Sequence, residues 1–401
     1  FLSFINCSFS AAIFFNNTEA DSSLGFCGTN NPRTANSKIS SRSFLIPYSV
    51  IFLLLPRPWE LRFLMADDHT SMFSVINCSA DGFEAAITED GTLVFNTQSD
   101  LTIKNLTVEN SATRGIVVNV PEDAEGDDIS VTLKNVNVLS SALFGLHIDD
   151  NIDAFDNGNT GSSIGVDLEI YNSNFIGNGT GALDFDGIRV DERSDGDISS
   201  WIVRSHIDGN GGDGIELDEA GNGSIFSTMT NVTLNDNGFY NEDDLDDGFD
   251  IDEADDGNIQ VNLYRVEVSN NRDEGLDFDE AGNGSISVTA RNIIAEGNSD
   301  EAIKADEEDA GDITLNLTKI TVLKSGDDGI QFTELGEGSI GGVLNKVSVS
   351  ESKKYGIKAG QWIIEDEAEI SEPSGYLKIK NVILEGNSKG DNIETHNVSV
   401  K

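Results

Sequence analysis

The feature that most constrains the fold of this chain is a repeat of about 27 residues. A leading glycine or alanine recurs at this interval at every step but one in the second half of the sequence. The series is Gly187, Gly214, Gly248, Gly275, Ala302, Gly329 and Gly356. The exceptional step, from Gly214 to Gly248, is lengthened by an insertion at 239–245. Weaker copies begin at Gly82, Gly115 and Gly145. Such a period indicates a stack of similar units, each packed on its neighbours.

Each unit contains three short segments in which apolar and polar residues alternate, such as 214–218, 224–229 and 232–235. Alternation bounded by Gly, Asn and Asp predicts β-strands, and no unit holds a helical stretch of useful length. Apolar residues recur at equal offsets, one column being Ile188, Ile215, Phe249, Leu276, Ile303 and Ile330 and another Ile198, Ile225, Ile259, Ile286, Ile313 and Ile340. Equal offsets mean that like residues stack on like.

A single unit cannot bury these apolar side chains, whereas coils stacked in parallel register bury all of them in one column. The sequence therefore predicts an all-β, right-handed parallel β-helix of about 10–11 coils, each of roughly 27 residues with three short strands. The handedness follows from the preference for right-handed crossovers between parallel strands.

Two further columns carry expectations about turns. The leading glycines and a second series nine positions later, of which Gly223 is one, suit a positive φ. Asn210, Asn237, Asn271 and Asn298 share another offset. Their amides predict a ladder of hydrogen bonds along one turn.

Residues 1–66 differ from the rest of the chain. They carry five basic and three acidic groups, and their apolar run at 44–55 is too short for a membrane span. A degenerate signal segment and non-native upstream sequence are both open alternatives. We expect residues 1–66 to be poorly ordered and residues 67–401 to form the β-helix domain.

The cysteines predict no metal site. Three of them, Cys7, Cys27 and Cys78, lie outside the regular repeats without metal-ligand spacing.

Charge narrows the classes of partner. The chain has 71 acidic and 25 basic residues, a net charge of −46. Nucleic acid is excluded as a partner because phosphate binding needs a basic surface. No membrane span is predicted. Divalent cations are the expected ligands, and an extracellular or cell-surface location is the expected one.

An acidic row supports the cation prediction. Four positions after successive leading residues stand Asp149, Asp191, Asp218, Asp252, Asp279 and Asp306, each followed by another acid. Stacked coils place like charges about 5 Å apart, where they repel unless cations bridge them. Calcium suits oxygen ligands at that spacing. The following turns, such as 218–225, resemble the first half of an EF-hand loop. The candidate metal ligands are Asp191, Asp195, Asp218, Asn222, Asp252, Asp256, Asp279, Asn283 and Asp306. The alternative is a solvated acidic face adapted to salt water.

Over residues 80–400 these repeats resemble the right-handed parallel β-helix superfamily typified by pectate lyases. The resemblance implies the fold, while the activities of such proteins include lyases, hydrolases, epimerases, adhesins and surface proteins. Segment 325–329 resembles the Gly-Asp-Asp motif of polygalacturonases without its partner motifs. Segment 247–253 resembles an alginate C5-epimerase motif, but Asp252 stands where that motif has His. No catalytic residue is assigned, and Lys304 is expected to form a salt bridge that relieves the acidic row.

Two functional hypotheses remain. The first is a secreted or cell-surface acidic β-solenoid that acts as a calcium-stabilised structural or adhesive scaffold. The alternative is a polysaccharide-active enzyme, namely a uronate lyase, an epimerase or a glycoside hydrolase. A polysaccharide or another cell-surface component is the candidate macromolecular partner. An enzyme should break the periodicity around one groove, whereas the repeat stays regular from Gly187 to Ile340.

Overall fold

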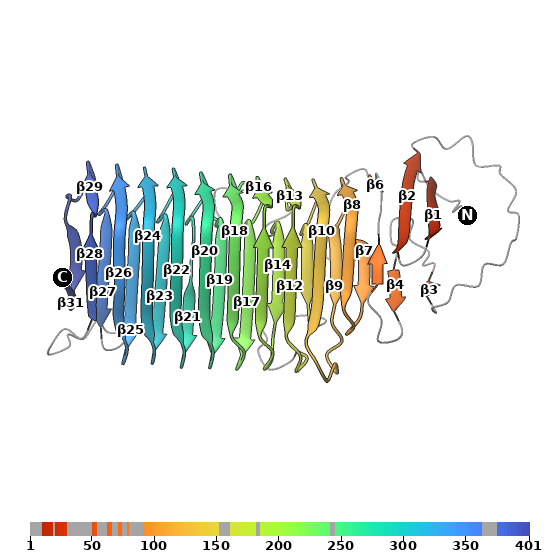
Figure 1. Ribbon diagram of the computed structural model, residues 1–401, viewed down its shortest axis with the longest axis horizontal. Helices are drawn as coiled ribbons and strands as arrows, with labels where there is room; N and C mark the ends of the chain where they lie inside the picture. Colours follow the sequence, from red (N-terminus) through yellow and green to blue (C-terminus); the bar gives the residue numbers. More distant parts are fainter. Residues whose placement is uncertain are drawn as a thin grey trace, which may run out of the picture.

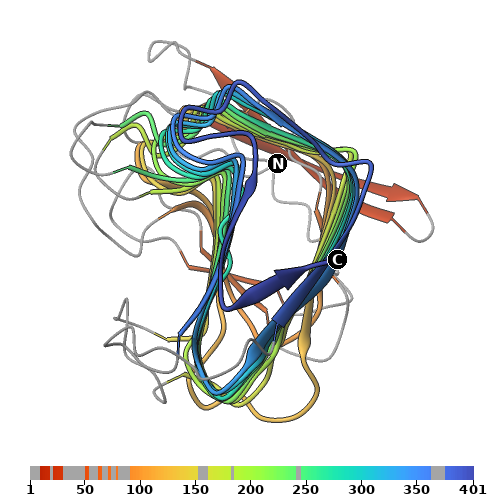
Figure 2. The same cartoon turned by 90° about the vertical axis from the view of Figure 1, so that its left-hand side faces the viewer.

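The structure, a computed structural model, describes residues 91–151, 161–181, 185–240, 245–362 and 375–401, together with the backbone of six short strands before them. The strands stand side by side along one long axis (Figure 1), and the coils superpose when viewed down that axis (Figure 2). The pairings between successive coils are parallel throughout the repeats. The predicted parallel β-helix is therefore confirmed.

Two long sheets form the walls of the β-helix. Sheet 1 contains β7 (Gly91–Asn96), β9 (Arg114–Asn119), β11 (Leu146–Asp149), β14 (Ile188–Glu192), β17 (Ile215–Gly221), β19 (Phe249–Asp255), β21 (Asp279–Gly282), β23 (Ile303–Asp309), β25 (Ile330–Gly336), β27 (Ile357–Trp362) and β30 (Ile393–His396). Sheet 2 contains β8 (Leu101–Glu109), β10 (Ile129–Leu139), β12 (Val166–Tyr171), β13 (Asn174–Ile176), β15 (Ile198–Val203), β16 (His206–Asp208), β18 (Ile225–Asn235), β20 (Asn258–Ser269), β22 (Ser285–Glu296), β24 (Asp312–Leu323), β26 (Ser339–Ser350), β28 (Gly375–Lys380), β29 (Ile383–Glu385) and β31 (Val398–Val400).

Six strands precede the regular coils. They are β1 (Ser10–Thr18), β2 (Asp21–Thr29), β3 (Val50–Leu53), β4 (Arg62–Met65), β5 (Ser71–Phe73) and β6 (Cys78–Ser79). Strands β1 and β2 form an antiparallel pair, while β4 joins sheet 1 beside β7. The weak repeat at Gly82 and most of residues 1–66 lie outside the described residues. The expectation of poor order for that segment stays a prediction.

The second and third predicted segments of a coil are separate strands in some coils and run together in others. Strands β12 and β13 are separate, whereas β18 spans both segments and turns at Asn231, which has a φ of 55°. The equivalent position in the following coils also has positive φ, and it is occupied by Arg265, Asn292, Lys319 and Lys346. A single left-handed residue thus bends the long strand between its two straight parts.

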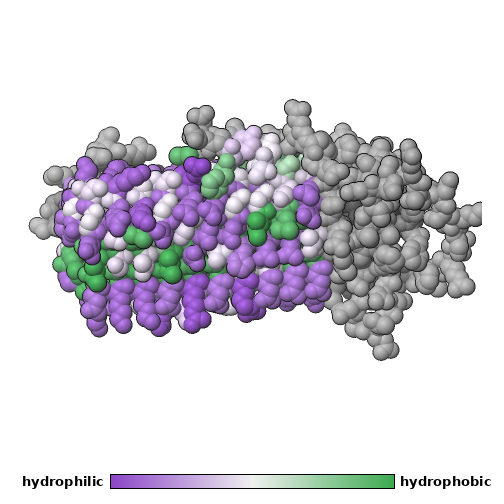
Figure 3. All heavy atoms as spheres, turned by 90° about the horizontal axis from the view of Figure 1, so that it is seen from above, coloured by the Kyte–Doolittle hydropathy of each residue, from purple (hydrophilic) through white to green (hydrophobic). Residues whose placement is uncertain are grey.

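The register stacks like side chains as predicted. Ile188 pairs with Ile215, and Ile303 with Ile330, each one regular repeat apart, while Ile215 pairs with Phe249 across the longer step. These residues are fully or almost fully buried in one continuous apolar core. Hydrophilic side chains repeat in rows along the outside (Figure 3). No helix of membrane-spanning length and hydropathy occurs in the part of the chain that the structure describes.

The asparagine ladder is also confirmed. Asn210 donates its side-chain amide to Asn237 at 2.9 Å, Asn237 to Asn271 at 3.1 Å, and Asn271 to Asn298 at 3.1 Å. The ladder extends one coil further than predicted, because Asn178 donates to Asn210 at 3.1 Å. All these amides are buried, so each must satisfy its hydrogen bonds within the turn.

The prediction of positive φ for the two glycine series is wrong. Neither Gly214 nor Gly223 adopts it. Glycine is required there by close approach between coils. A Cβ atom on Gly214 would lie 2.4 Å from the carbonyl oxygen of Gly248, and one on Gly223 would lie 2.0 Å from that of Gly196. Stacking at the spacing of a parallel sheet leaves no room for a side chain at these corners.

Candidate metal site on the acidic face

The predicted acidic row lies on sheet 1. Parallel pairing places Asp191 beside Asp218, Asp218 beside Asp252, Asp252 beside Asp279, and Asp279 beside Asp306. The carboxyl groups of neighbouring coils therefore form one file along the rod. Metal binding by this file stays a prediction, and the contacts of its members differ from one end to the other.

Arginine side chains neutralise the N-terminal part of the file. Arg193 donates to Asp191 at 2.9 Å and to Asp218 at 2.7 Å, and Arg189 donates to the same two carboxylates at 2.8 and 2.9 Å. Burial alone would raise the pKa of Asp191, but Arg189, His147 and Arg193 outweigh it and hold that pKa well below its ordinary value. The protein thus supplies its own cations to Asp191 and Asp218.

A histidine extends this ion-pair network toward the N-terminus. Arg114 donates from Nη1 to Nδ1 of His147 at 2.8 Å. His147 Nε2 lies 2.6 Å from Oδ2 of Asp191, and its hydrogen therefore points to that carboxylate. His147 and Arg189 occupy the outward column in which the next coils carry Glu216 and Asp250. The acidic pattern of this column is therefore interrupted at the N-terminal end, and it is interrupted again at Lys304.

The four predicted turn ligands are exposed and paired with one another. Asn222 donates its amide to Asp195 at 2.7 Å, and Asn283 donates to Asp256 at 2.6 Å. Each bond joins successive coils across the turn. The turn carboxylates therefore already accept a hydrogen bond, which weakens them as candidate ligands.

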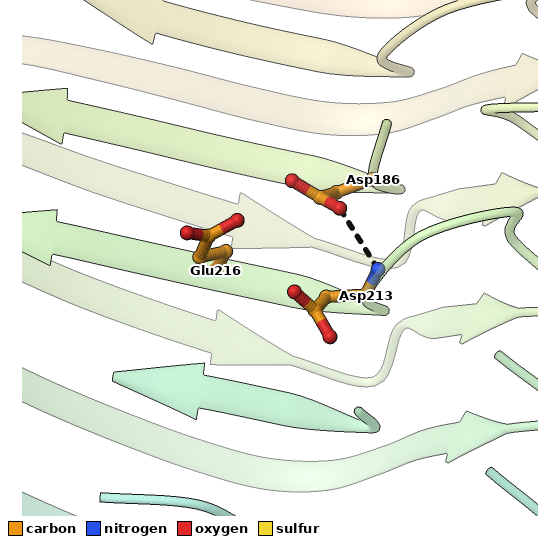
Figure 4. A group of neighbouring side chains, drawn as sticks. All are labelled: Asp186, Asp213 and Glu216. Atoms are coloured by element: carbon orange, nitrogen blue, oxygen red, sulfur yellow. Dashed lines mark hydrogen bonds between the residues drawn. The ribbon is translucent and has the colours of Figure 1, made fainter. Parts of the chain in front are cut away.

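A second set of carboxylates lies beside the file on the same face, and none of its own members was among the predicted ligands. Most of them stand directly before the leading residue, as Asp213 does, or two residues after it, as Glu216 does, and they form groups with Asp252 of the file. Figure 4 shows Asp186, Asp213 and Glu216 converging from two successive coils. In each of the following groups, ligand oxygens lie within 4.8 Å of one another: Asp186, Asp213 and Glu216; Glu216, Asp250 and Asp252; Asp247, Asp250 and Asp277; Asp247, Asp273 and Glu274; and Glu274, Asp300 and Glu301.

The group Asp247, Asp250 and Asp277 is the strongest candidate, and we call it the central cluster. Asp247 is 7% exposed and Asp277 is 5% exposed. One oxygen of each, Oδ1 in both cases, has no hydrogen-bond partner among the described residues. A buried carboxylate oxygen without a partner costs free energy, so a missing ligand is expected there.

The central cluster binds protons more tightly than isolated carboxyl groups do. Burial and then repulsion from neighbouring carboxylates raise the pKa values of Asp247 and Asp250, and raise the pKa of Asp277 to about 7 despite the nearby Lys304. The same causes, in the same order, raise the pKa of Asp252 to about 6. Carboxyl pKa values raised in this way mean that the ionised groups are destabilised, and a bound cation would stabilise them.

Lys304 provides the counter-charge on the C-terminal side. Its Nζ atom lies 2.7 Å from Asp277, 3.3 Å from Asp279, 3.5 Å from Glu274 and 3.8 Å from Asp306. Burial lowers the pKa of Lys304, but these carboxylates outweigh it and raise the pKa far above its ordinary value. The predicted salt-bridge role is confirmed, and a lysine held so firmly protonated is a poor general base.

The acids that follow the file point into the turn and form a buried glutamate column. Successive coils pair Glu192, Glu219, Glu253, Glu280, Glu307 and Glu334, with Gln361 in the next position. A Cβ atom on Gly284 would lie 2.4 Å from Oε1 of Glu280, so the second glycine of each coil makes room for this column. Burial and then repulsion from Glu307 raise the pKa of Glu280 to about 8.

The glutamate column predicts an unusual pH dependence. Between its unfolded pKa near 4.5 and its folded pKa of about 8, Glu280 holds a proton only in the folded state. Stability is therefore lost as pH rises through this interval. Glutamine keeps the shape and cannot ionise. We expect Glu280→Gln to raise the free energy of unfolding by about 1–3 kcal/mol at about pH 9 and to change it little at about pH 4.

Urea unfolding at the two pH values measures this difference. The control is Glu267→Gln on β20, where the side chain is exposed and the change should be small at both pH values. An equal effect of Glu280→Gln at both pH values would show that the column is not protonated in the folded protein.

Comparisons with known proteins bear on the fold. No family model matches the sequence, and no curated protein matches it either. Among solved structures, the chain is similar to the crystal structure of the periplasmic alginate epimerase AlgG, with 9% sequence identity and a TM-score of 0.36. The similarity covers 85% of this chain and 78% of that one. At this level of identity the likeness concerns the fold alone.

Proposed function

We propose that the protein is an extracellular or cell-surface scaffold whose β-helix is stabilised by divalent cations, calcium first among them. The cations bind the central cluster on the outer face of sheet 1. The observation that carries the proposal is the pair of buried, unpartnered oxygens on Asp247 and Asp277. Together with Asp250 they form a site in which every donor atom is a carboxylate oxygen.

Two properties of the central cluster favour an added cation over a counter-charge from the protein. The largest charge effects on Asp247 and Asp250 come from other carboxylates. Arg189 pairs with Glu216, one coil before the cluster, and Lys304 pairs with Asp277, one of its three members. The negative charge of Asp247 and Asp250 is therefore the part that an added cation would neutralise.

The donor set favours calcium. Calcium accepts six to eight oxygen ligands in flexible geometry, whereas magnesium requires a near-ideal octahedron and retains water. The overlapping carboxylate groups offer many oxygens within reach of one ion. Extracellular modules bind calcium with dissociation constants of about 10⁻⁴–10⁻³ M, which suits a site that shares its ligands between coils.

The regularity of the molecule supports the scaffold role. The asparagine ladder, the glutamate column and the apolar core run through successive coils with the same pairings. Such continuity gives a stiff rod, in which each coil is supported by its two neighbours.

Calorimetric titration of calcium into chelator-treated protein tests the proposal. We expect the double variant Asp247→Asn, Asp277→Asn to lose the tightest binding step. The matched double variant Asp195→Asn, Asp256→Asn, which alters the exposed turns, should keep it. Loss of that step only in the turn variant would place the ion at the turns, and an unchanged titration of both variants would contradict a specific site.

A second candidate function rests on the break in the acidic pattern. His147, Arg189 and Arg193 concentrate basic groups at one end of the face, around Asp191 and Asp218. Such a local departure is expected of a polysaccharide-active enzyme rather than of a scaffold. Incubation with pectate and alginate, with and without calcium, distinguishes the two. Unsaturated or epimerised product that disappears in His147→Ala would support the enzyme and reject the purely structural role.

A further inference from the structure

Sheet 2 carries an outward face that differs in charge from the rest of the molecule. Six adjacent strands each contribute three outward positions before the bend, and we call this set the neutral strip. It consists of Ser199, Trp201 and Val203 on β15; Phe226, Thr228 and Thr230 on β18; Gln260, Asn262 and Tyr264 on β20; Ser287, Thr289 and Arg291 on β22; Thr314, Asn316 and Thr318 on β24; and Gly341, Val343 and Asn345 on β26.

No member of the neutral strip is acidic, and one is basic. With 71 acidic residues in 401, about three of the 18 positions would be acidic at the average frequency of the chain. Surface positions normally hold more charge than the average, so the depletion is larger than this comparison indicates. The strip replaces charge with hydroxyl groups, amides and aromatic rings.

Two aromatic side chains stand exposed at one end of the strip. Trp201 is 49% exposed and Phe226 is 38% exposed. They lie on adjacent strands, since Trp201 pairs with Thr228 and Phe226 is two residues before Thr228 on the same face. Rings on neighbouring strands at this offset are close enough to form one apolar platform.

The middle column of the strip carries polar groups that the fold does not use. The side chains of Thr228, Asn262, Thr289 and Asn316 stack in one outward column. None of them makes a side-chain hydrogen bond to another described residue, in contrast to the ladder inside the turn, where Asn237 bonds both neighbours. Their donors and acceptors therefore face solvent in a regular row, about 4.8 Å from one coil to the next.

We propose that the neutral strip binds an uncharged polysaccharide, whose sugar rings stack on Trp201 and Phe226 while its hydroxyl groups bond to the row of threonines and asparagines. A pyranose ring has an apolar face and a polar edge, and an exposed aromatic ring beside amides and hydroxyl groups complements both. The lack of carboxylates on the strip means that binding desolvates no acid. A polyanion is disfavoured because the chain as a whole carries −46.

This inference is independent of the cation site, because the central cluster lies on sheet 1 and the strip on sheet 2. The proposed cation site and the proposed polysaccharide site can therefore be tested and rejected independently of each other. Calcium titration should be unchanged in a variant of the strip, and retention on a glucan should be unchanged in Asp247→Asn, Asp277→Asn, provided that both proteins are folded.

Affinity electrophoresis in calcium buffer tests the inference, with hydroxyethyl cellulose, mixed-linkage β-glucan, galactomannan or pectate cast in the gel. We expect retardation in at least one neutral polymer and not in pectate. The double variant Trp201→Ala, Phe226→Ala should lose about tenfold or more in affinity. Ile294→Ala, which removes a 51% exposed side chain from the same sheet beyond the bend, should bind as the wild type does. All three sites are on the surface, so the variants should fold.

Several results would overturn the inference. These are retardation in none of the neutral polymers, retardation in pectate alone, or equal retardation of the wild type and the double variant. Light scattering provides a further check. A dimer that dissociates on Trp201→Ala, Phe226→Ala would assign the strip to contact between two copies of this chain instead.

Discussion

Removing divalent cations at neutral pH is expected to lower the melting temperature of this protein by about 5 °C or more. An ion held at a hundred times its dissociation constant stabilises the folded state by about 2.7 kcal/mol. Without it, Asp247, Asp250 and Asp277 repel one another in a buried site. Differential scanning calorimetry with calcium and with a chelator measures the difference, and Asp247→Asn, Asp277→Asn should reduce it.

Acid should replace the cation. The pKa of Asp277 is raised to about 7 and that of Asp252 to about 6, so these carboxyl groups take up protons as pH falls toward about 5. The difference between calcium and chelator should therefore shrink at low pH. A difference of the same size at about pH 5 and at about pH 8 would show that calcium acts on groups other than these.

Lys304→Met is expected to lower the free energy of unfolding by about 3 kcal/mol in chelator, because it leaves four carboxylates without their shared counter-charge. The variant should also gain calcium dependence. Glu274, Asp277, Asp279 and Asp306 would then form an oxygen-only site one coil beyond the central cluster. Urea unfolding with and without calcium measures both effects.

Lys324→Met is the matched control for this change. Lys324 pairs with Glu296 at 3.0 Å, but both side chains are about half exposed. An exposed pair contributes little to stability because solvent screens it, and its loss should not alter the response to calcium. If Lys304→Met cost no more than Lys324→Met, the carboxylates around Lys304 would not depend on its charge.

Residue patterns were sufficient to predict the coils and their register. Apolar residues at fixed offsets, such as Ile188 and Ile215, can be buried together only if one stacks on the other. The asparagine ladder followed from the same argument, since Asn237 and Asn271 share an offset. The predicted backbone conformation of the glycines was wrong. Glycine occurs both where φ is positive and where two backbones approach closely, and the sequence alone does not distinguish the two cases.

The candidate site was predicted only in part. The row from Asp191 to Asp306 was read from its regularity, and that row does lie on one face. The central cluster was missed because Asp247 stands before the leading glycine and Asp250 after it, so that no single column contains both. The signal was present, since Asp213, Asp247, Glu274 and Glu301 each precede a leading residue.

The partners of the arginines could not be read from spacing. Arg193 occupies the position that Ala220 and Ala254 hold in the next coils. Its guanidinium reaches Asp191 and Asp218 rather than the solvent. That choice depends on the rotamer of a long side chain and on the carboxylates around it, which sequence periodicity does not encode.

The placement of Arg189 and Lys304 in one outward column has a consequence for how such rods diverge. A coil with a basic residue in that column supplies a positive charge to its own acidic groups, whereas a coil with an acid there depends on cations from solution. Because each coil contacts just its two neighbours, one substitution in this column would change the cation dependence of a single coil and leave that of the other coils as it was. Related chains would thus adapt to different salinities by substitutions in individual coils.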